Sequence, residues 1–180
     1  MNTAPTPQER MDTSFDNYLA LSEVLRSDVW ALYEIESDSQ HWRRNFVRSS
    51  AVLIEGYSHC IREICAVGLE CVAPEISKEE AKVVKSERGF DANERIKLTL
   101  RAAYKLFELE LTPNFEGHQW PCARRVIEKR HLLMHPQKPA DLEVPNELWL
   151  ELRDGVEWLL KQHFDFIAAI EEKYGDRRRA

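Results

Sequence analysis

The sequence predicts an all-α protein that folds as an antiparallel helical bundle. Apolar residues recur at helical spacing along most of the chain, whereas no segment shows the sustained alternation of a strand. Turn dipeptides that favour hairpins, such as Asn-Gly, are absent. The chain has 180 residues, of which 43% are hydrophobic and 31% charged, and this mixture is typical of one globular domain.

The N-terminal end predicts a flexible tail over residues 1–13, because this stretch holds two prolines and little to bury. A single helical domain is expected over residues 14–175. Its first helix is predicted to begin near Ser14, which can serve as an N-cap, and to continue to Tyr33.

Two long helices are predicted, at about residues 40–72 and 145–174. Between them we expect a short polar helix over 78–86, a helix after Asp91 whose inner face reaches Leu111, and a helix from Trp120 to about His135. One of Trp149 and Trp158 is expected at the surface. The predicted core comprises Leu25, Val29, Leu32, Val52, Ile54, Ile61, Ile64, Leu100, Tyr104, Phe107, Ile127, Leu133, Leu152, Val156, Leu159 and Ile167, and Phe164 is also expected to face inward.

Composition excludes several classes of protein. Six glycines and no Gly-rich motif argue against a phosphate-binding loop, and a net charge of −6 argues against a generally cationic nucleic-acid coat. No apolar run approaches the roughly 20 residues of a membrane span. The polar N-terminus resembles no signal peptide, so a cytoplasmic location with four reduced cysteines is expected.

Basic residues concentrate between His118 and Lys138. This segment holds five Lys or Arg and one Glu, a local charge of +4, so the rest of the chain carries −10. Such an island can attract an anion, and Arg124, Arg125 and Lys129 are candidate substrate-binding residues. The alternative is a solvated helix end whose cations complement the helix dipole.

Histidines add acid–base chemistry to this segment. His131 and His135 share one helix face because they lie four residues apart. Arg130 precedes His135 by five residues, so the two side chains converge only if the helix unwinds before Pro136. A metal site that also uses His118 and Cys122 is not expected, because continuous helix separates the two ligand pairs by roughly 13 Å.

A second polar stripe is predicted on the helix at about 40–72. Arg48, Glu55, His59 and Arg62 fall on one face beside the apolar stripe. This face is expected to border the basic island, so Arg48 and Glu55 are further candidate substrate-binding residues. Glu55 is also expected to fix an imidazole tautomer by accepting its N–H. The alternative is a solvated, ion-paired face.

The segment Arg130-His131-Leu-Leu-Met-His135-Pro136 resembles the R-φ-x3-H motif of HEPN domains, in which φ is a polar residue. Trp120 before the motif and Pro136 after it are similar to that family, as is the helical pattern over about 40–175. The resemblance implies an RNA-cleaving or RNA-binding domain, usually a homodimer whose two motifs face each other across a cleft.

The resemblance also implies a mechanism without metal or cofactor. An imidazole takes the proton of a 2′-hydroxyl, which attacks the adjacent phosphorus, while a guanidinium binds the phosphate oxygens. Arg130, His131 and His135 are the implied catalytic residues, with His135 as base or acid, Arg130 as the group that binds the phosphate and His131 as a polar auxiliary. We expect an endoribonuclease of the toxin or phage-defence kind, with a cognate antitoxin as a possible partner. The alternatives are a non-catalytic module that binds RNA, a nucleotide or a protein, and a helical interaction protein in which the motif is accidental.

Overall fold

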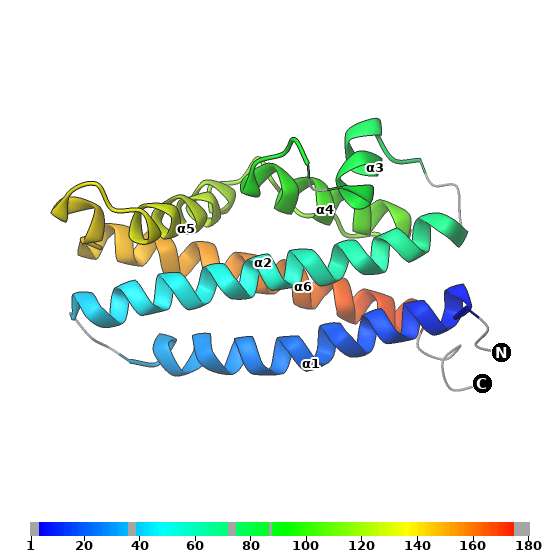
Figure 1. Cartoon of the computed structure of the whole chain (residues 1–180), viewed down its shortest axis with the longest axis horizontal. Coiled ribbons are helices and arrows are strands. Elements are labelled where there is room, and N and C mark those ends of the chain that lie inside the picture. Colours follow the sequence, from blue (N-terminus) through cyan, green and yellow to red (C-terminus); the bar gives the residue numbers. More distant parts are fainter. Residues whose placement is uncertain (1–3, 36–38, 72–74, 87, 175–180) are drawn as a thin grey trace. The chain divides into compact units, whose positions relative to one another are not determined.

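The computed structural model describes residues 4–35, 39–71, 75–86 and 88–174, and in these residues it contains helices and no strand (Figure 1). The predicted all-α fold is therefore confirmed. Residues 1–3 of the predicted tail and the predicted end points 72 and 175 lie outside the described residues. The elements are α1 (Pro7–Tyr33), α2 (Gln40–Cys71), α3 (Lys78–Lys85), α4 (Ala92–Leu106), α5 (Gln119–Met134), the 3-10 helix η1 (Pro139–Leu142) and α6 (Asn146–Tyr174).

The first helix begins at Pro7, so the prediction that it begins near Ser14 is wrong, and residues 7–13 of the predicted tail are helical. Thr6 caps this helix. Its hydroxyl accepts the N–H of Glu9 at 3.2 Å, and the Glu9 carboxylate accepts the N–H of Thr6 at 2.7 Å. Proline suits the first helical position because its missing N–H would have no partner there. The Thr-Pro-Gln-Glu sequence is thus a capping signal.

The two short central helices begin as the sequence predicts. Ser77 and Glu80 form a reciprocal capping box at α3, and Asp91 and Glu94 form another at α4. In each box the two side chains accept backbone N–H groups that would otherwise lack a partner at the start of the helix. Local sequence therefore fixes both starting points.

The C-terminal end of α4 differs from the prediction, because the helix stops at Leu106 and Leu111 is 64% exposed. Glu108 has φ of 49°, in the left-handed region that favours glycine. This turn lets the N–H of Leu109 donate to the Tyr104 carbonyl at 2.9 Å, which closes the helix. Lys173 also donates to the Glu108 carbonyl, at 2.9 Å.

Substitution of Glu108 by glycine is expected to stabilise the protein by about 0.5–1 kcal/mol, because glycine adopts a positive φ without the Cβ clash. The lost contact between Lys173 and the Glu108 carboxylate, 3.4 Å long, contributes little because that carboxylate is highly exposed. Chemical denaturation followed by circular dichroism measures the effect. The Glu108→Ala variant, which keeps the Cβ, should be no more stable than wild type. A glycine variant less stable than the alanine variant would contradict the assignment of strain.

The chain divides into two compact units. Unit 1 comprises 1–21, 57–113 and 163–180, and unit 2 comprises 22–56 and 114–162. The helices α1, α2 and α6 each contribute residues to both units, so neither unit is a continuous stretch of sequence.

In unit 1, α1 and α2 are antiparallel, because Arg10 pairs with Glu70 while Tyr18 stacks on Tyr57. Tyr57 also contacts the buried ring of His163 from α6, with centroids 4.8 Å apart. A second aromatic cluster joins α4 and its C-cap to α6 through Tyr104, Phe107, Phe166 and Tyr174.

In unit 2, aromatic side chains pack between α5 and α6. Phe115, Trp120 and Trp158 have ring centroids 5.1–5.9 Å apart. Near this cluster the two helices approach closely at Gly155, where a Cβ would lie 2.5 Å from the backbone N of Ala123. On the α2 side, Trp149 contacts Phe46 edge to face at 4.8 Å. These contacts fix α5, which carries the predicted motif.

Most of the predicted core is buried, with three corrections. Val52 is 49% exposed because it lies between Arg48 and Glu55 on the polar face of α2. Phe164 is 43% exposed, and both Trp149 and Trp158 are buried, so neither tryptophan is the predicted surface residue. Leu25, Leu32, Phe107 and Ile167 are half-buried.

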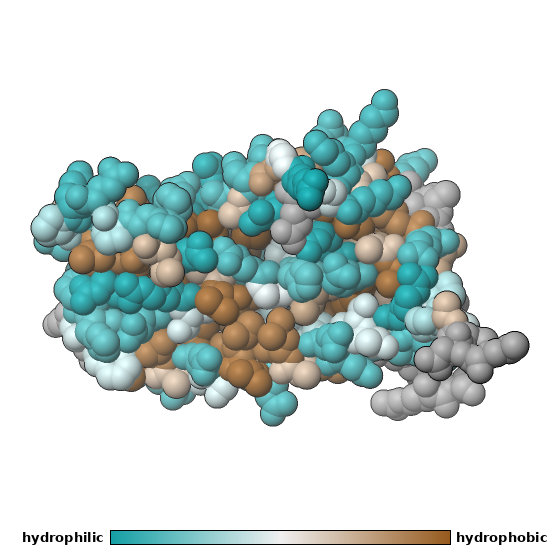
Figure 2. Space-filling view, in the orientation of Figure 1, coloured by the Kyte–Doolittle hydropathy of each residue, from teal (hydrophilic) through white to brown (hydrophobic). Residues whose placement is uncertain are grey.

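Figure 2 shows a largely hydrophilic surface, with apolar side chains reaching it over α1 and α2. Among the described residues, no helix has an apolar stretch long enough to cross a membrane.

Candidate active site

The predicted motif occupies the C-terminal turn of α5 and the residue after it. Arg130 and His131 are helical, and the N–H of His135 donates to the His131 carbonyl at 3.0 Å. His135 itself has φ −131° and ψ 59°, so the backbone leaves the helix there, immediately before Pro136. The expected departure from helical geometry at the motif is therefore present.

The two motif histidines lie together at this helix end. Their ring centroids are 5.2 Å apart and both residues are exposed. In the part of the chain that the structure describes, neither ring makes a hydrogen bond or a carboxylate ion pair. Two adjacent imidazoles that solvent can reach are able to accept and donate protons.

Glu55 contacts Arg130 and not a histidine. A carboxylate oxygen of Glu55 lies 3.7 Å from Nη2 of Arg130, and each side chain is 34% exposed. The prediction that Glu55 fixes an imidazole is therefore wrong in this structure. Within the described residues no hydrogen bond joins Arg130 to His135.

Arg48 supports the same helix end from α2. Its guanidinium donates to the Leu133 carbonyl at 3.4 Å and to the Asn45 amide oxygen at 3.5 Å. The Leu133 carbonyl belongs to the last turn of α5, whose carbonyls lack helical partners. Arg48 was expected to bind substrate, and here its half-buried side chain positions the motif.

The three remaining basic candidates are engaged by the protein itself. Arg124 pairs with Glu128 at 3.5 Å, and Arg125 pairs with Glu151 of α6. Both arginines are about half exposed. They can therefore still meet an anion, although their charges are partly compensated.

Lys129 requires a clear correction, because its side chain is buried. The residue is 7% exposed, and its ammonium donates to the Asp141 carbonyl at 2.9 Å. Burial lowers the pKa of Lys129, against the opposing effect of Asp141 and Glu143. Lys129 therefore holds the segment after the motif in place. The prediction that it binds a substrate is wrong in this structure.

A network of side chains fixes that segment, and the sequence prediction missed it. The Asp141 carboxylate accepts the N–H groups of Gln137 and Lys138 at 2.9 and 3.1 Å, and these hydrogen bonds lower its pKa. From α2, Gln40 and Arg43 each donate to the Val144 carbonyl at 3.0 Å. Asp141 lies three residues after Lys138 in the sequence, so their hydrogen bond is a local capping signal. The contacts from α2 instead span about a hundred residues of sequence.

Two further residues of the polar stripe on α2, His59 and Arg62, contact each other. His59 and Arg62 belong to unit 1, where the Arg62 guanidinium lies 2.7 Å from Nδ1 of His59. All four cysteines are free, with Cys60 and Cys65 buried, Cys122 half-buried and Cys71 exposed. Burial raises the pKa of Cys65. Over residues 4–35, 39–71, 75–86 and 88–174, no three His, Cys, Asp or Glu side chains gather as metal ligands would.

Comparison with known proteins finds no matching family model, no matching curated protein and no matching solved structure. Two exposed imidazoles, one guanidinium that is one-third exposed and the carboxylate paired with it form the candidate site.

Proposed function

We propose that this chain is a metal-independent endoribonuclease whose active site is the C-terminal end of α5. The observation that carries the proposal is the pair of exposed imidazoles, His131 and His135, 5.2 Å apart and beside Arg130 in sequence. Among the described residues neither imidazole makes a hydrogen bond or a carboxylate ion pair, whereas Arg124, Arg125 and Arg130 each pair with a glutamate. The resemblance of the motif to HEPN domains supports the same activity.

The proposed reaction needs one base, one acid and one cation. His135 accepts the proton of a 2′-hydroxyl, whose oxygen attacks the adjacent phosphorus. The bond from phosphorus to the 5′-oxygen breaks, and His131 protonates the leaving oxygen. Arg130 binds the phosphate oxygens and stabilises the added negative charge of the transition state. The products are a 2′,3′-cyclic phosphate and a 5′-hydroxyl.

The ion pair of Arg130 and Glu55 bears directly on substrate binding. Both side chains are one-third exposed, so a phosphate can reach the guanidinium and displace the carboxylate. A homodimer would add a second Arg130 and His135 to the site, as the resemblance implies. An antitoxin that covers the exposed histidines would inhibit the enzyme.

The change Glu55→Gln is expected to strengthen binding of single-stranded RNA by up to about fivefold, because a partly exposed ion pair contributes up to about 1 kcal/mol. Fluorescence anisotropy with a labelled RNA measures the dissociation constant. The matched control is Glu128→Gln, which removes the carboxylate beside Arg124. Weaker binding by Glu55→Gln than by wild type would show that Glu55 does not compete with RNA.

The second candidate is a non-catalytic module that binds RNA, a nucleotide or a protein. The ion pairs of Arg124 and Arg125 with glutamates and the burial of Lys129 favour it, because paired or buried cations attract RNA less strongly. Such a module would bind RNA and leave it intact.

A cleavage assay separates the two candidates. EDTA-treated protein is incubated with a single-stranded RNA and with the same sequence carrying 2′-O-methyl groups. The endoribonuclease cleaves only the RNA, because the methylated strand lacks the attacking hydroxyl. Binding of both strands without cleavage would establish the non-catalytic module, and cleavage of both would exclude attack by the 2′-oxygen.

A further inference from the structure

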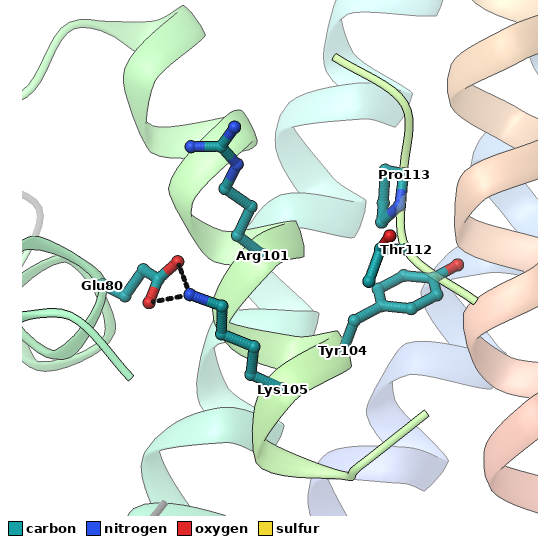
Figure 3. Close-up of a pocket in the computed structure, with 6 residues that line it drawn as sticks. All are labelled: Glu80, Arg101, Tyr104, Lys105, Thr112 and Pro113. Atoms are coloured by element: carbon teal, nitrogen blue, oxygen red, sulfur yellow. Dashed lines mark hydrogen bonds and ion pairs between the residues drawn. The ribbon is translucent and has the colours of Figure 1, made fainter. Parts of the chain in front are cut away.

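A cavity of about 310 Å³ lies in unit 1, beside α3, α4 and the segment that follows α4. Figure 3 shows the residues that line it. Lys105 and Arg101 extend from α4, Glu80 comes from α3, and Thr112 and Pro113 belong to the following segment. Its volume falls at the lower end of the range of small-molecule sites, about 300–1,000 Å³. The lining is Glu80, Arg101, Tyr104, Lys105, Thr112 and Pro113.

The cavity has a buried and fully hydrogen-bonded anchor. The Glu80 side chain is 4% exposed, and its two oxygens accept from the Lys105 ammonium at 2.8 and 2.9 Å. One of them also accepts the N–H of Ser77 at 2.7 Å. Burial alone would raise the pKa of Glu80, but the hydrogen bonds from Lys105 and Ser77 outweigh it and lower that pKa. Glu80 therefore stays ionised and fixes the position of Lys105.

Lys105 keeps a donor for a ligand. An ammonium has three N–H groups, and the Glu80 carboxylate offers it two oxygens. The Lys105 side chain is 46% exposed, so its remaining N–H can face the cavity. Arg101 lies one helical turn before Lys105 on the same face of α4, and the Thr112 hydroxyl is a further polar group of the lining.

The charges of the lining favour an anion. The lining holds two cations, Arg101 and Lys105, and one carboxylate, Glu80, whose charge Lys105 already neutralises. A guanidinium fork together with an ammonium suits the oxygens of a phosphate group. Pro113 and the ring of Tyr104 supply an apolar part of the lining.

We propose that this cavity binds a small phosphate monoester, no larger than a mononucleotide, with its phosphate on Arg101 and Lys105. The hydroxyl of Thr112 adds a hydrogen bond, and the organic part of the ligand lies against Pro113. The site uses none of the residues of the proposed ribonuclease, so it goes beyond that function.

Isothermal titration calorimetry with inorganic phosphate, 5′-AMP and adenosine tests this site. Phosphate and 5′-AMP should bind and adenosine should not, because the phosphate supplies the charge that the site recognises. The Arg101→Gln variant should bind 5′-AMP at least about tenfold more weakly, and Thr112→Val more weakly than wild type. Lys105 is left intact because its loss would leave the Glu80 carboxylate buried without its cation.

One control locates the binding. Arg88→Gln removes an exposed cation outside the lining and should leave the affinity unchanged. The proposal is overturned if adenosine binds as well as 5′-AMP, if neither phosphate compound binds at millimolar concentration, or if Arg101→Gln binds 5′-AMP as tightly as wild type.

Discussion

Replacement of His135 by alanine is expected to slow RNA cleavage by about 10²–10⁴-fold, the usual contribution of a general acid or base. His135 is exposed and makes no side-chain hydrogen bond among the described residues, so its loss should leave the fold intact. The measurement is the single-turnover rate on a labelled single-stranded RNA in EDTA. Circular dichroism and a denaturation curve establish that the variant is folded.

His118 provides the matched control. It is an exposed histidine at the other end of α5, and its side chain makes no capping hydrogen bond. The His118→Ala variant should cleave RNA at the rate of wild type. If His135→Ala kept the wild-type rate, or if both variants lost activity equally, the assignment of the base to His135 would be wrong.

Substitution of Gly155 by alanine is expected to destabilise the protein by about 1–3 kcal/mol, the usual cost of overpacking. A Cβ on Gly155 would lie 2.5–2.6 Å from backbone atoms of Cys122 and Ala123 in α5. Backbone atoms of a packed helix cannot move as a side chain can, so α5 and α6 must separate. Urea denaturation followed by circular dichroism gives the loss of unfolding free energy.

Gly68 allows a control for the effect of alanine on helix propensity. Both glycines are helical, and alanine gains about 1 kcal/mol over glycine in a helix interior. The nearest atom to a Cβ on Gly68 is Cδ2 of Leu106, 2.7 Å away, and that flexible side chain can shift. The Gly68→Ala variant should therefore be clearly more stable than Gly155→Ala. Equal stability of the two variants would show that the α5–α6 contact is not tight.

Sequence patterns predict the parts of this fold that depend on local interactions. Helical periodicity predicts the long helices α2 and α6 within a residue or two, and the cap at Asp91 predicts the start of α4. The cap at Thr6 is a local signal of the same kind. Few apolar residues surround it, so helical periodicity does not indicate a helix start there. The exposure of Val52 follows from its place on the polar face of α2.

Contacts between distant segments account for what the sequence could not predict. The motif of Arg130, His131 and His135 and the unwinding at its end follow from local spacing and from Pro136. The contact of Glu55 with Arg130 and the burial of Lys129 against η1 depend on how helices pack, and residue spacing along one helix carries no information on this. For the same reason, basic residues that form one cluster in the sequence have separate partners in the fold.

The chemical nature of the RNA ends after incubation with EDTA-treated protein tests the proposed function most directly. Mass spectrometry of the fragments should find 2′,3′-cyclic phosphates and 5′-hydroxyls, produced by wild type and His118→Ala and absent with His135→Ala. Intact RNA, or fragments that end in a 3′-hydroxyl and a 5′-phosphate, would contradict attack by the 2′-oxygen at the α5 histidines.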